Sequence, residues 1–216
     1  MKKKNTWIKV VITIIILELV VGGIIFTYKK LNTDNDNSVS TNDKEVKELY
    51  EKIAYNDIES IDVLSPKIML YYGYKNMEIT ESINCDVVKP IEDTAGYSCN
   101  GIVDFIPSKD IEKSVKDIYG DVNVEMISFE LDPNHYAFYD EEALGFAIYT
   151  KDEEVSVEPI NMNLKEAIKD EDSIILTVEV KDGIYGTVKD TYNFTFTKEG
   201  KNYYLTSKEI VTNKGE

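Results

Sequence analysis

The chain has 216 residues and carries 24 lysines and no arginine against 40 acidic residues, which gives a net charge of −16 at pH 7. A protein with this balance repels nucleic acids and anionic headgroups through its overall field. Without arginine it also lacks the planar donor fork that grips phosphate. These counts exclude nucleic-acid binding. The acidic excess lies after residue 30, where 18 lysines face 39 acidic residues and the net charge is −21.

The first predicted element is an apolar stretch of 22 residues, 7–28, with lysines before and after it. A helix rises about 1.5 Å per residue, so this stretch is long enough to cross the roughly 30 Å hydrocarbon layer of a bilayer. A cleaved signal peptide is the alternative, but bulky residues stand where a small-residue cleavage site belongs. Lysines are more numerous before the stretch than after it, which favours a cytoplasmic N-terminus.

This pattern divides the chain into four parts. We predict a cytoplasmic tail over 1–6, a single-pass transmembrane helix in the lipid bilayer over 7–28, and a flexible stalk over 29–43. Residues 44–216 are long enough for one extracytoplasmic domain with its own core. The expected localisation is therefore the cell membrane, with the C-terminal domain outside.

Glu18 is the least ordinary residue of the predicted span. An acidic side chain there costs about 2.5–3.5 kcal/mol on insertion scales. On a helix it shares a face with Gly22, which lets another backbone approach closely. The functional interpretation is a contact with a partner helix or with a second copy; the alternative is a protonated glutamate tolerated by an apolar helix. A pilin-like signal is a more remote alternative, because Thr13 stands where that signal needs glycine.

After the stalk, apolar periodicity predicts a helix over 43–56. Ser65 and Pro66 provide an N-cap and a first-turn proline for a second helix, which includes 68–77. The tyrosines of this helix are spaced around it instead of along one face, which favours core packing over a sugar-stacking platform. They are Tyr71, Tyr72 and Tyr74.

Cys85 and Cys99 are the chain's two cysteines. Outside the cytoplasm they have one intramolecular pairing, and a disulfide that closes a loop of this length contributes about 3 kcal/mol. We predict that the bridge joins antiparallel strands near 84–88 and 97–103. Two buried free thiols are the alternative. A metal site is disfavoured, because no further cysteine or histidine stands nearby.

The remaining pattern predicts a third helix and then strands. Ser108 is the expected N-cap of this helix and Gly120 its end. From Val122 the apolar period changes to two, with turns at 132–134, 140–142, 181–183 and 198–201. The predicted strands are 122–131, 135–139, 144–149, 173–181, 192–197 and 203–211. The expected fold class is α+β, with N-terminal helices packed on a mainly antiparallel sheet. A curved sheet around helices, as in cystatin or NTF2, is one topology that fits this pattern.

Two segments carry a resemblance: the Y-x-F-T-F-x-K-E-x-G-x-Y-Y-L-x-S pattern of 192–207 and the I-E-K-S-V-K-D-I-Y-G helix end of 111–120. With the overall layout, they resemble uncharacterised single-pass, membrane-anchored extracytoplasmic proteins of low-GC Gram-positive bacteria. The resemblance implies a location and no activity.

Catalytic motifs are scarce. The chain has one histidine, His135, beside a turn, and it has neither a nucleophile elbow nor a glycine-rich phosphate loop. Acid clusters at 141–142, 152–154 and 170–172 fit solvated turns better than a glycosidase pair. Asp34, Asp36, Ser38 and Glu45 match part of a calcium loop, but Val39 replaces its essential glycine. We therefore assign no catalytic, cofactor or metal residues.

The sequence favours a non-enzymatic envelope binding or accessory component whose extracellular partner it does not identify. The alternative is a hydrolase of wall glycan or peptide that uses acidic residues. A deep cleft with two facing, buried acids would favour the hydrolase.

Overall fold

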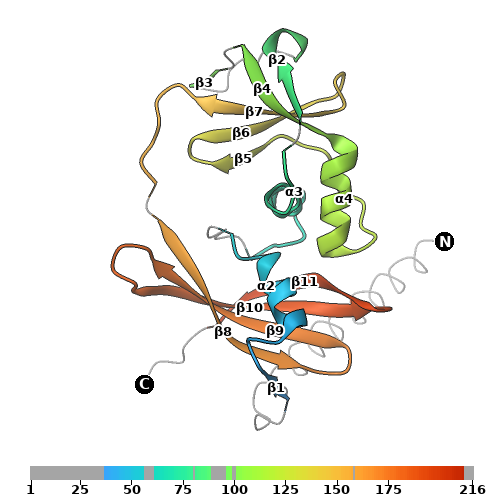
Figure 1. Cartoon of the computed structure of the whole chain (residues 1–216), viewed down its shortest axis with the longest axis vertical. Helices are drawn as coiled ribbons and strands as arrows, with labels where there is room; N and C mark the ends of the chain where they lie inside the picture. The colour runs from blue at the N-terminus through green and yellow to red at the C-terminus, as the bar shows by residue number, and fades with distance from the viewer. Residues whose placement is uncertain are drawn as a thin grey trace, which may run out of the picture. The chain divides into compact units, whose positions relative to one another are not determined.

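The computed structural model describes residues 37–55, 61–79, 81–88, 96–98, 101–157 and 159–211. The chain divides between Ser38 and Val39, and the following concerns the part that begins at Val39. The described residues form a mixed α+β fold with two antiparallel sheets (Figure 1). The helices are α2 (Lys44–Glu51), α3 (Pro66–Lys75) and α4 (Ser108–Tyr119), with a short 3-10 helix at Cys85–Val87. The strands are β1 (Ser38–Val39), β2 (Glu81–Asn84), β3 (Tyr97–Ser98), β4 (Ile102–Pro107), β5 (Phe129–Asp132), β6 (His135–Asp140), β7 (Gly145–Lys151), β8 (Ile160–Lys169), β9 (Ser173–Asp182), β10 (Val188–Glu199) and β11 (Asn202–Ile210).

The C-terminal sheet has the order β1-β8-β9-β10-β11. From β8 to β11 it is a meander, in which each strand pairs with the next one along the chain. Alternate side chains of β9 and β10 are buried, as expected for a sheet with one face on the core. Phe194 and Phe196 are fully buried, and Leu176 lies opposite Phe194 in the register. This alternation makes the inner face of the sheet continuous and apolar.

The central sheet has the order β2-β4-β7-β6-β5, and β3 also pairs with β7. Its strands are not in chain order, because α4 is inserted between β4 and β5. Gly145 begins β7 where a Cβ atom would lie 2.2 Å from Cζ of Phe105, so only glycine fits this close approach. The central sheet thus depends on contacts between residues that are distant in sequence.

Helices α2 and α3 lie between the two sheets (Figure 1), and side chains of α2, α3, α4 and both sheets form one hydrophobic core. Val46 and Leu49 are the buried residues of α2, and the helix packs against β9. Helices α3 and α4 pack closely at Gly73, where the Ser114 hydroxyl donates a 2.7 Å hydrogen bond to the Gly73 carbonyl. The N-terminal helix α2 therefore covers the sheet formed by the C-terminal strands.

The predicted arrangement of helices followed by one sheet is wrong in its finer form. The α+β class and the antiparallel pairing are confirmed, but the strands form two sheets, and α4 lies along the chain between β4 and β5 of the central sheet. Strand β8 lies in a segment for which no strand was predicted. Its alternation of Ile160, Met162 and Leu164 is interrupted by a register shift before Glu166, which conceals the period of two.

Several predicted boundaries also need correction. Helix α2 ends at Glu51, well before residue 56. In place of the strand expected over 84–88, β2 ends at Asn84 and the 3-10 helix begins at Cys85. The strand expected over 97–103 is divided between β3 and β4. Only the end of the strand expected over 122–131 is regular, in β5. Pro107, and not Ser108, is the N-cap of α4.

Other local predictions are confirmed. Ser65 occupies the N-cap position of α3 and Pro66 lies in its first turn, but the Ser65 hydroxyl makes no capping hydrogen bond and donates instead to the carbonyl of Asp62. Gly120 ends α4 with a positive φ of 79°, and the hairpin between β10 and β11 turns at Gly200, whose φ is 64°. Both angles lie in the region that glycine adopts at little cost. Tyr71 and Tyr72 are buried, as core packing requires.

Candidate functional site

Glu18 and Gly22, the predicted intramembrane contact, lie outside the described residues, as does the whole predicted span 7–28. Within the described part of the chain, no helix is long and apolar enough to cross a bilayer. The anchor and its contact therefore stay predictions.

Cys85 begins the 3-10 helix, and its amide donates a 3.0 Å hydrogen bond to the carbonyl of Gly101. The sulfur of Cys85 is disulfide-bonded. Cys99 is the other cysteine of the chain, but it lies outside the described residues. The pairing of Cys85 with Cys99 accordingly stays a prediction.

The acid clusters considered for a hydrolase lie on separate turns. Glu141 and Glu142 are exposed in the turn between β6 and β7, whereas Glu171 and Asp172 are exposed in the turn between β8 and β9. The exposed cluster 152–154 follows β7. In the part of the chain that the structure describes, no group of three acidic, histidine or cysteine side chains is placed to hold a metal ion. The predicted clusters are thus not brought together.

His135 is the first residue of β6, at the strand edge where it was expected. Its Nδ1 lies 2.9 Å from both carboxylate oxygens of Asp132. Asp132 also accepts a 2.8 Å hydrogen bond from the amide of Asn134. The Asp132 carboxylate therefore links the backbone of the turn between β5 and β6 to the imidazole ring of His135.

The outer face of the central sheet carries an aromatic cluster that sequence reasoning missed. It contains four side chains, here called the aromatic strip: Tyr97, Tyr136, Phe138 and Tyr149. In the strand register Tyr136 lies opposite Tyr149, and Phe138 is two residues further along the same strand. Alternation along a strand therefore places these side chains on one face. The intervening Ala137 is fully buried on the other face, in the main core.

The ring geometry of the aromatic strip is well defined. The centroids of Tyr97 and Tyr136 are 5.6 Å apart with an interplanar angle of 41°. Phe138 and Tyr149 meet edge to face, with centroids 6.1 Å apart. Tyr149 is buried in a small second core, whereas the other three rings are half-buried. The strip is thus anchored at Tyr149 and keeps part of its surface accessible.

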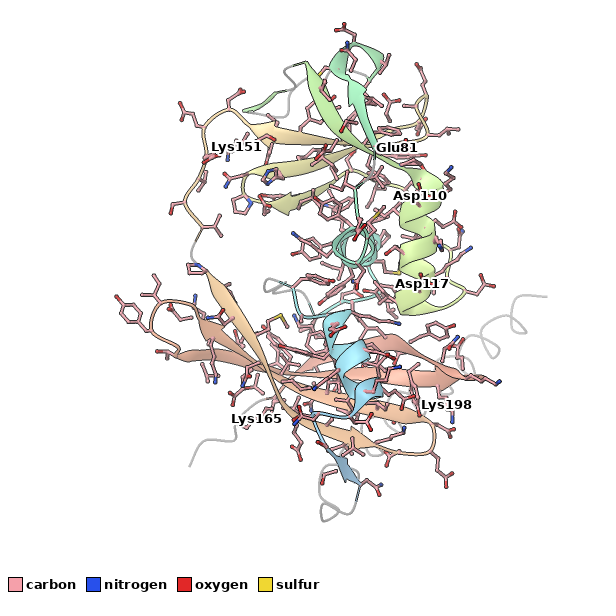
Figure 2. The ribbon with its side chains drawn as sticks, in the orientation of Figure 1. Glu81, Asp110, Asp117, Lys151, Lys165 and Lys198 are labelled. Carbon is pink, nitrogen blue, oxygen red and sulfur yellow. The ribbon has the colours of Figure 1, made fainter. Side chains whose placement is uncertain are left out.

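Polar and charged groups surround the aromatic strip. Glu130 lies opposite Tyr136 in the register and is exposed. Lys151, at the end of β7 (Figure 2), lies opposite Tyr97, and its Nζ is 5.9 Å from the centroid of that ring. Burial raises the pKa of the Tyr97 hydroxyl, and the nearby carboxylates of Glu130 and Asp132 raise it further. The hydroxyl of Tyr97 therefore stays protonated, and available as a donor, at neutral pH.

The sequence contains a signal for this strip, although a weak one. Strand β6 reads HYAFYD, with apolar residues at successive positions instead of alternating with polar ones. Such a strand packs against other side chains, or contacts a ligand, on both of its faces. Its partner β7 shows the same pattern, with Phe146, Ala147 and Ile148 in succession. Only the tertiary structure shows which of the two faces meets the helices.

A second region consists of hollows beside α2. A cavity of about 490 Å³ is lined by residues of α2, Asp117 of α4 and the hairpin of β10 and β11. Another, of about 410 Å³, is lined by Glu45, Lys169, Lys198 and neighbouring residues. Lys169 forms an ion pair with Glu45, and Lys52 donates a 2.7 Å hydrogen bond to the carbonyl of Asp117. Lys198 and Asp117 are labelled in Figure 2. These contacts attach α2 to its neighbours, so we interpret the hollows as structural.

No protein-family model matches this chain, and neither a curated protein nor a solved structure matches it.

Proposed function

We propose that this chain is a single-pass membrane protein whose extracytoplasmic domain binds an envelope glycan through the aromatic strip, as a non-enzymatic binding or accessory component. The supporting observation is the strip itself: three aromatic rings that are partly exposed on an outer sheet face beside the buried Tyr149, with polar groups at their rim. An aromatic residue that needs only core packing is normally covered, whereas an accessible cluster marks an interaction site.

The chemistry of the aromatic strip suits a pyranose ring. A sugar ring presents an apolar face of C–H groups, which packs on aromatic rings, and a polar edge of hydroxyls. At the edge of the strip, Glu130 offers an acceptor, while Lys151 and the hydroxyl of Tyr97 offer donors. Recognition through an apolar platform with a few placed polar groups is the usual design of small-molecule sites.

A binding assay with the full chain tests this proposal. The purified protein in detergent is mixed with insoluble wall glycan and sedimented, and the bound fraction is measured. We expect Tyr97→Ala and Tyr136→Ala each to weaken binding about tenfold, which corresponds to roughly 1.4 kcal/mol. Tyr136→Phe keeps the ring and is expected to retain most of the binding. Tyr185→Ala, at an exposed tyrosine far along the chain, is the matched control.

Equal binding by the wild type and both alanine variants would overturn the glycan proposal. The same assay also reports on the hydrolase alternative. Release of reducing ends that is lost in Glu141→Gln or Glu142→Gln would replace a binding role with hydrolysis.

The predicted location has its own test: after reduction of intact cells, a membrane-impermeant thiol reagent should label Cys85. Labelling only after lysis would overturn the predicted orientation.

The intramembrane contact is tested in membranes. Crosslinking and capture of the full chain are compared between the wild type and Glu18→Leu. We expect a crosslinked helix partner, or a crosslinked second copy, to be lost in the variant. An unchanged set of crosslinks would reject the role proposed for Glu18 and Gly22.

A further inference from the structure

The hairpin between β9 and β10 has an apolar tip that projects into solvent. The side chain of Tyr185 is 83% exposed, that of Ile184 is 61% exposed and that of Val188 is 44% exposed. Val157, on the segment leading into β8, is also exposed. This segment meets the tip where the amide of Gly183 donates a 2.8 Å hydrogen bond to the Pro159 carbonyl. We call residues 182–188 the hairpin tip.

The hairpin tip is rigidly built. One carboxylate oxygen of Asp182 accepts hydrogen bonds from the amides of Ile184, at 2.7 Å, and Tyr185, at 2.8 Å. The backbone of Asp182 also bonds to Thr187 and Gly186. At Gly183 a Cβ atom would lie 2.4 Å from the carbonyl oxygen of Pro159, so only glycine allows this contact. The two most exposed apolar side chains are therefore held outward by the backbone, and little ordering entropy is lost when they bind.

Two lysines partly offset the acidic residues beside the hairpin tip. Lys189 lies 4.0 Å from the carboxylate of Asp182, and Lys181 forms an ion pair with Glu179. Residues 179–190 hold three acidic residues, Glu179, Asp182 and Asp190, against these two lysines, which leaves a net charge of −1. A zwitterionic headgroup carries no net charge that such a small excess would repel. Tyrosine and isoleucine suit the boundary between headgroups and acyl chains, because the ring is apolar and its hydroxyl stays hydrated.

The segment between the predicted span and β1 is short, and this favours the bilayer as the partner of the hairpin tip. If the predicted span ends at residue 28, residues 29–37 separate it from β1. Nine residues reach at most about 30 Å when fully extended. The domain is then confined near a bilayer, where a weak contact is strengthened by a high effective concentration.

We propose that the hairpin tip inserts Tyr185 and Ile184 into the interface of the bilayer that carries the predicted span. The tip is thereby a second, reversible membrane contact, and it orients the domain on the surface. This inference rests on the membrane anchor of the proposed function but not on glycan binding. It involves a zwitterionic lipid surface and requires no anionic lipid.

A fluorescence experiment on the full chain tests the inference. Trp7→Phe removes the chain's one tryptophan, and Tyr185→Trp then places a single reporter at the hairpin tip. The protein is reconstituted into phosphatidylcholine vesicles with and without brominated acyl chains, which quench tryptophan on contact. We expect at least twofold quenching of Trp at position 185. The matched control is Leu144→Trp in the same Trp7→Phe background; Leu144 is 65% exposed in a turn of the central sheet, and we expect no quenching there.

Each outcome is decisive. Quenching at position 185 that does not exceed the control overturns the inference, and so does a blue-shifted but unquenched emission, which indicates contact with protein. Asp182→Ala removes the acceptor that holds the tip and is expected to reduce quenching. Extraction of the same vesicles with carbonate reports on the anchor separately. Resistant protein without quenching rejects the tip contact alone, whereas extracted protein rejects the anchor.

Discussion

The two sheets of this domain are built in different ways. The C-terminal sheet is a meander of long strands, each paired with its chain neighbour, with buried side chains at alternate positions. The central sheet joins strands out of chain order and is apolar on both faces. Local pairing needs a turn and an alternating pattern, whereas the central sheet needs an inserted helix and a glycine contact at Gly145. The strands β9 to β11 of the meander are therefore the part that a sequence pattern can predict.

The largest expected effect tests whether the two sheets share one core. Phe194 of the C-terminal sheet and Phe146 of the central sheet are both fully buried in the same cluster. Replacing either by alanine should lower the free energy of unfolding by about 3–5 kcal/mol in a single transition. Urea unfolding of the full chain in detergent, followed by circular dichroism, measures this. Ile184→Ala, at an exposed site, is the control, and two separate transitions would contradict a shared core.

The second prediction concerns a change that should affect the central sheet more than the C-terminal sheet. Reducing the disulfide at Cys85 should destabilise the domain by about 3 kcal/mol, as expected for a loop of this length. Amide exchange should accelerate mainly in β2 and β4, beside Cys85, and less in β9 and β10. Cys99→Ser should reproduce the effect if the predicted pairing is correct. Exchange that accelerates equally in both sheets would contradict this local effect.

The third prediction concerns the helices between the sheets. At Gly73 an added Cβ atom would lie 2.6 Å from Cγ2 of Val115. Gly73→Ala should therefore cost about 1–3 kcal/mol through overpacking. Val115→Ala removes the clashing methyl group, so the double variant should be more stable than the sum of the single losses predicts. If the stability losses of the two single variants simply add in thermal unfolding, Gly73 and Val115 are not coupled, and the predicted clash between α3 and α4 is contradicted.

The smallest predicted effect is a pH dependence at the hairpin tip. Hydrogen bonds from the amides of Tyr185 and Ile184 hold the pKa of Asp182 below its ordinary value of 3.8. A depressed pKa in the folded state means that the carboxylate's stabilisation is present above the ordinary pKa and is lost as the pH falls through the folded pKa. The amide resonances of Ile184 and Tyr185 should shift together below pH 3.8. Asp182→Asn should abolish this shared titration, and a shift that persists would assign it to another group.

Much of the local structure could be predicted from short-range chemistry. Asp43 accepts hydrogen bonds from the amides of Glu45 and Val46 at the start of α2, within the helix that was predicted to begin there. Gly120 and Gly200 end their elements because the backbone turns at positive φ. The strand β8 was missed because a register shift interrupts its alternation, and Pro107 replaced Ser108 as N-cap because the cap depends on how β4 ends.

The candidate site could not be predicted in the same way. The strand β6 was predicted, but Tyr136 and Phe138 on one face and Ala137 and Tyr139 on the other are all apolar or aromatic, so its sequence does not distinguish the two faces. Large rings lie on both faces of the sheet, because Phe146 packs in the main core and Tyr149 packs in the small second core. The face that meets the helices is therefore set by the packing of whole elements.

The amino-acid sequence by itself determined the start of α2 at Asp43, the turns, the α+β class and the strands β9 to β11, because these follow from interactions between residues close along the chain. The tertiary structure alone decided that there are two sheets, that the aromatic strip faces outward and that Lys208 faces the core. A register shift after Thr195 leaves Lys208 opposite the buried Phe194, with its Nζ 3.9 Å from the ring centroid of Tyr192. A one-residue shift in pairing exchanges the two faces of a strand, and such a shift depends on the partner strand and not on the local sequence.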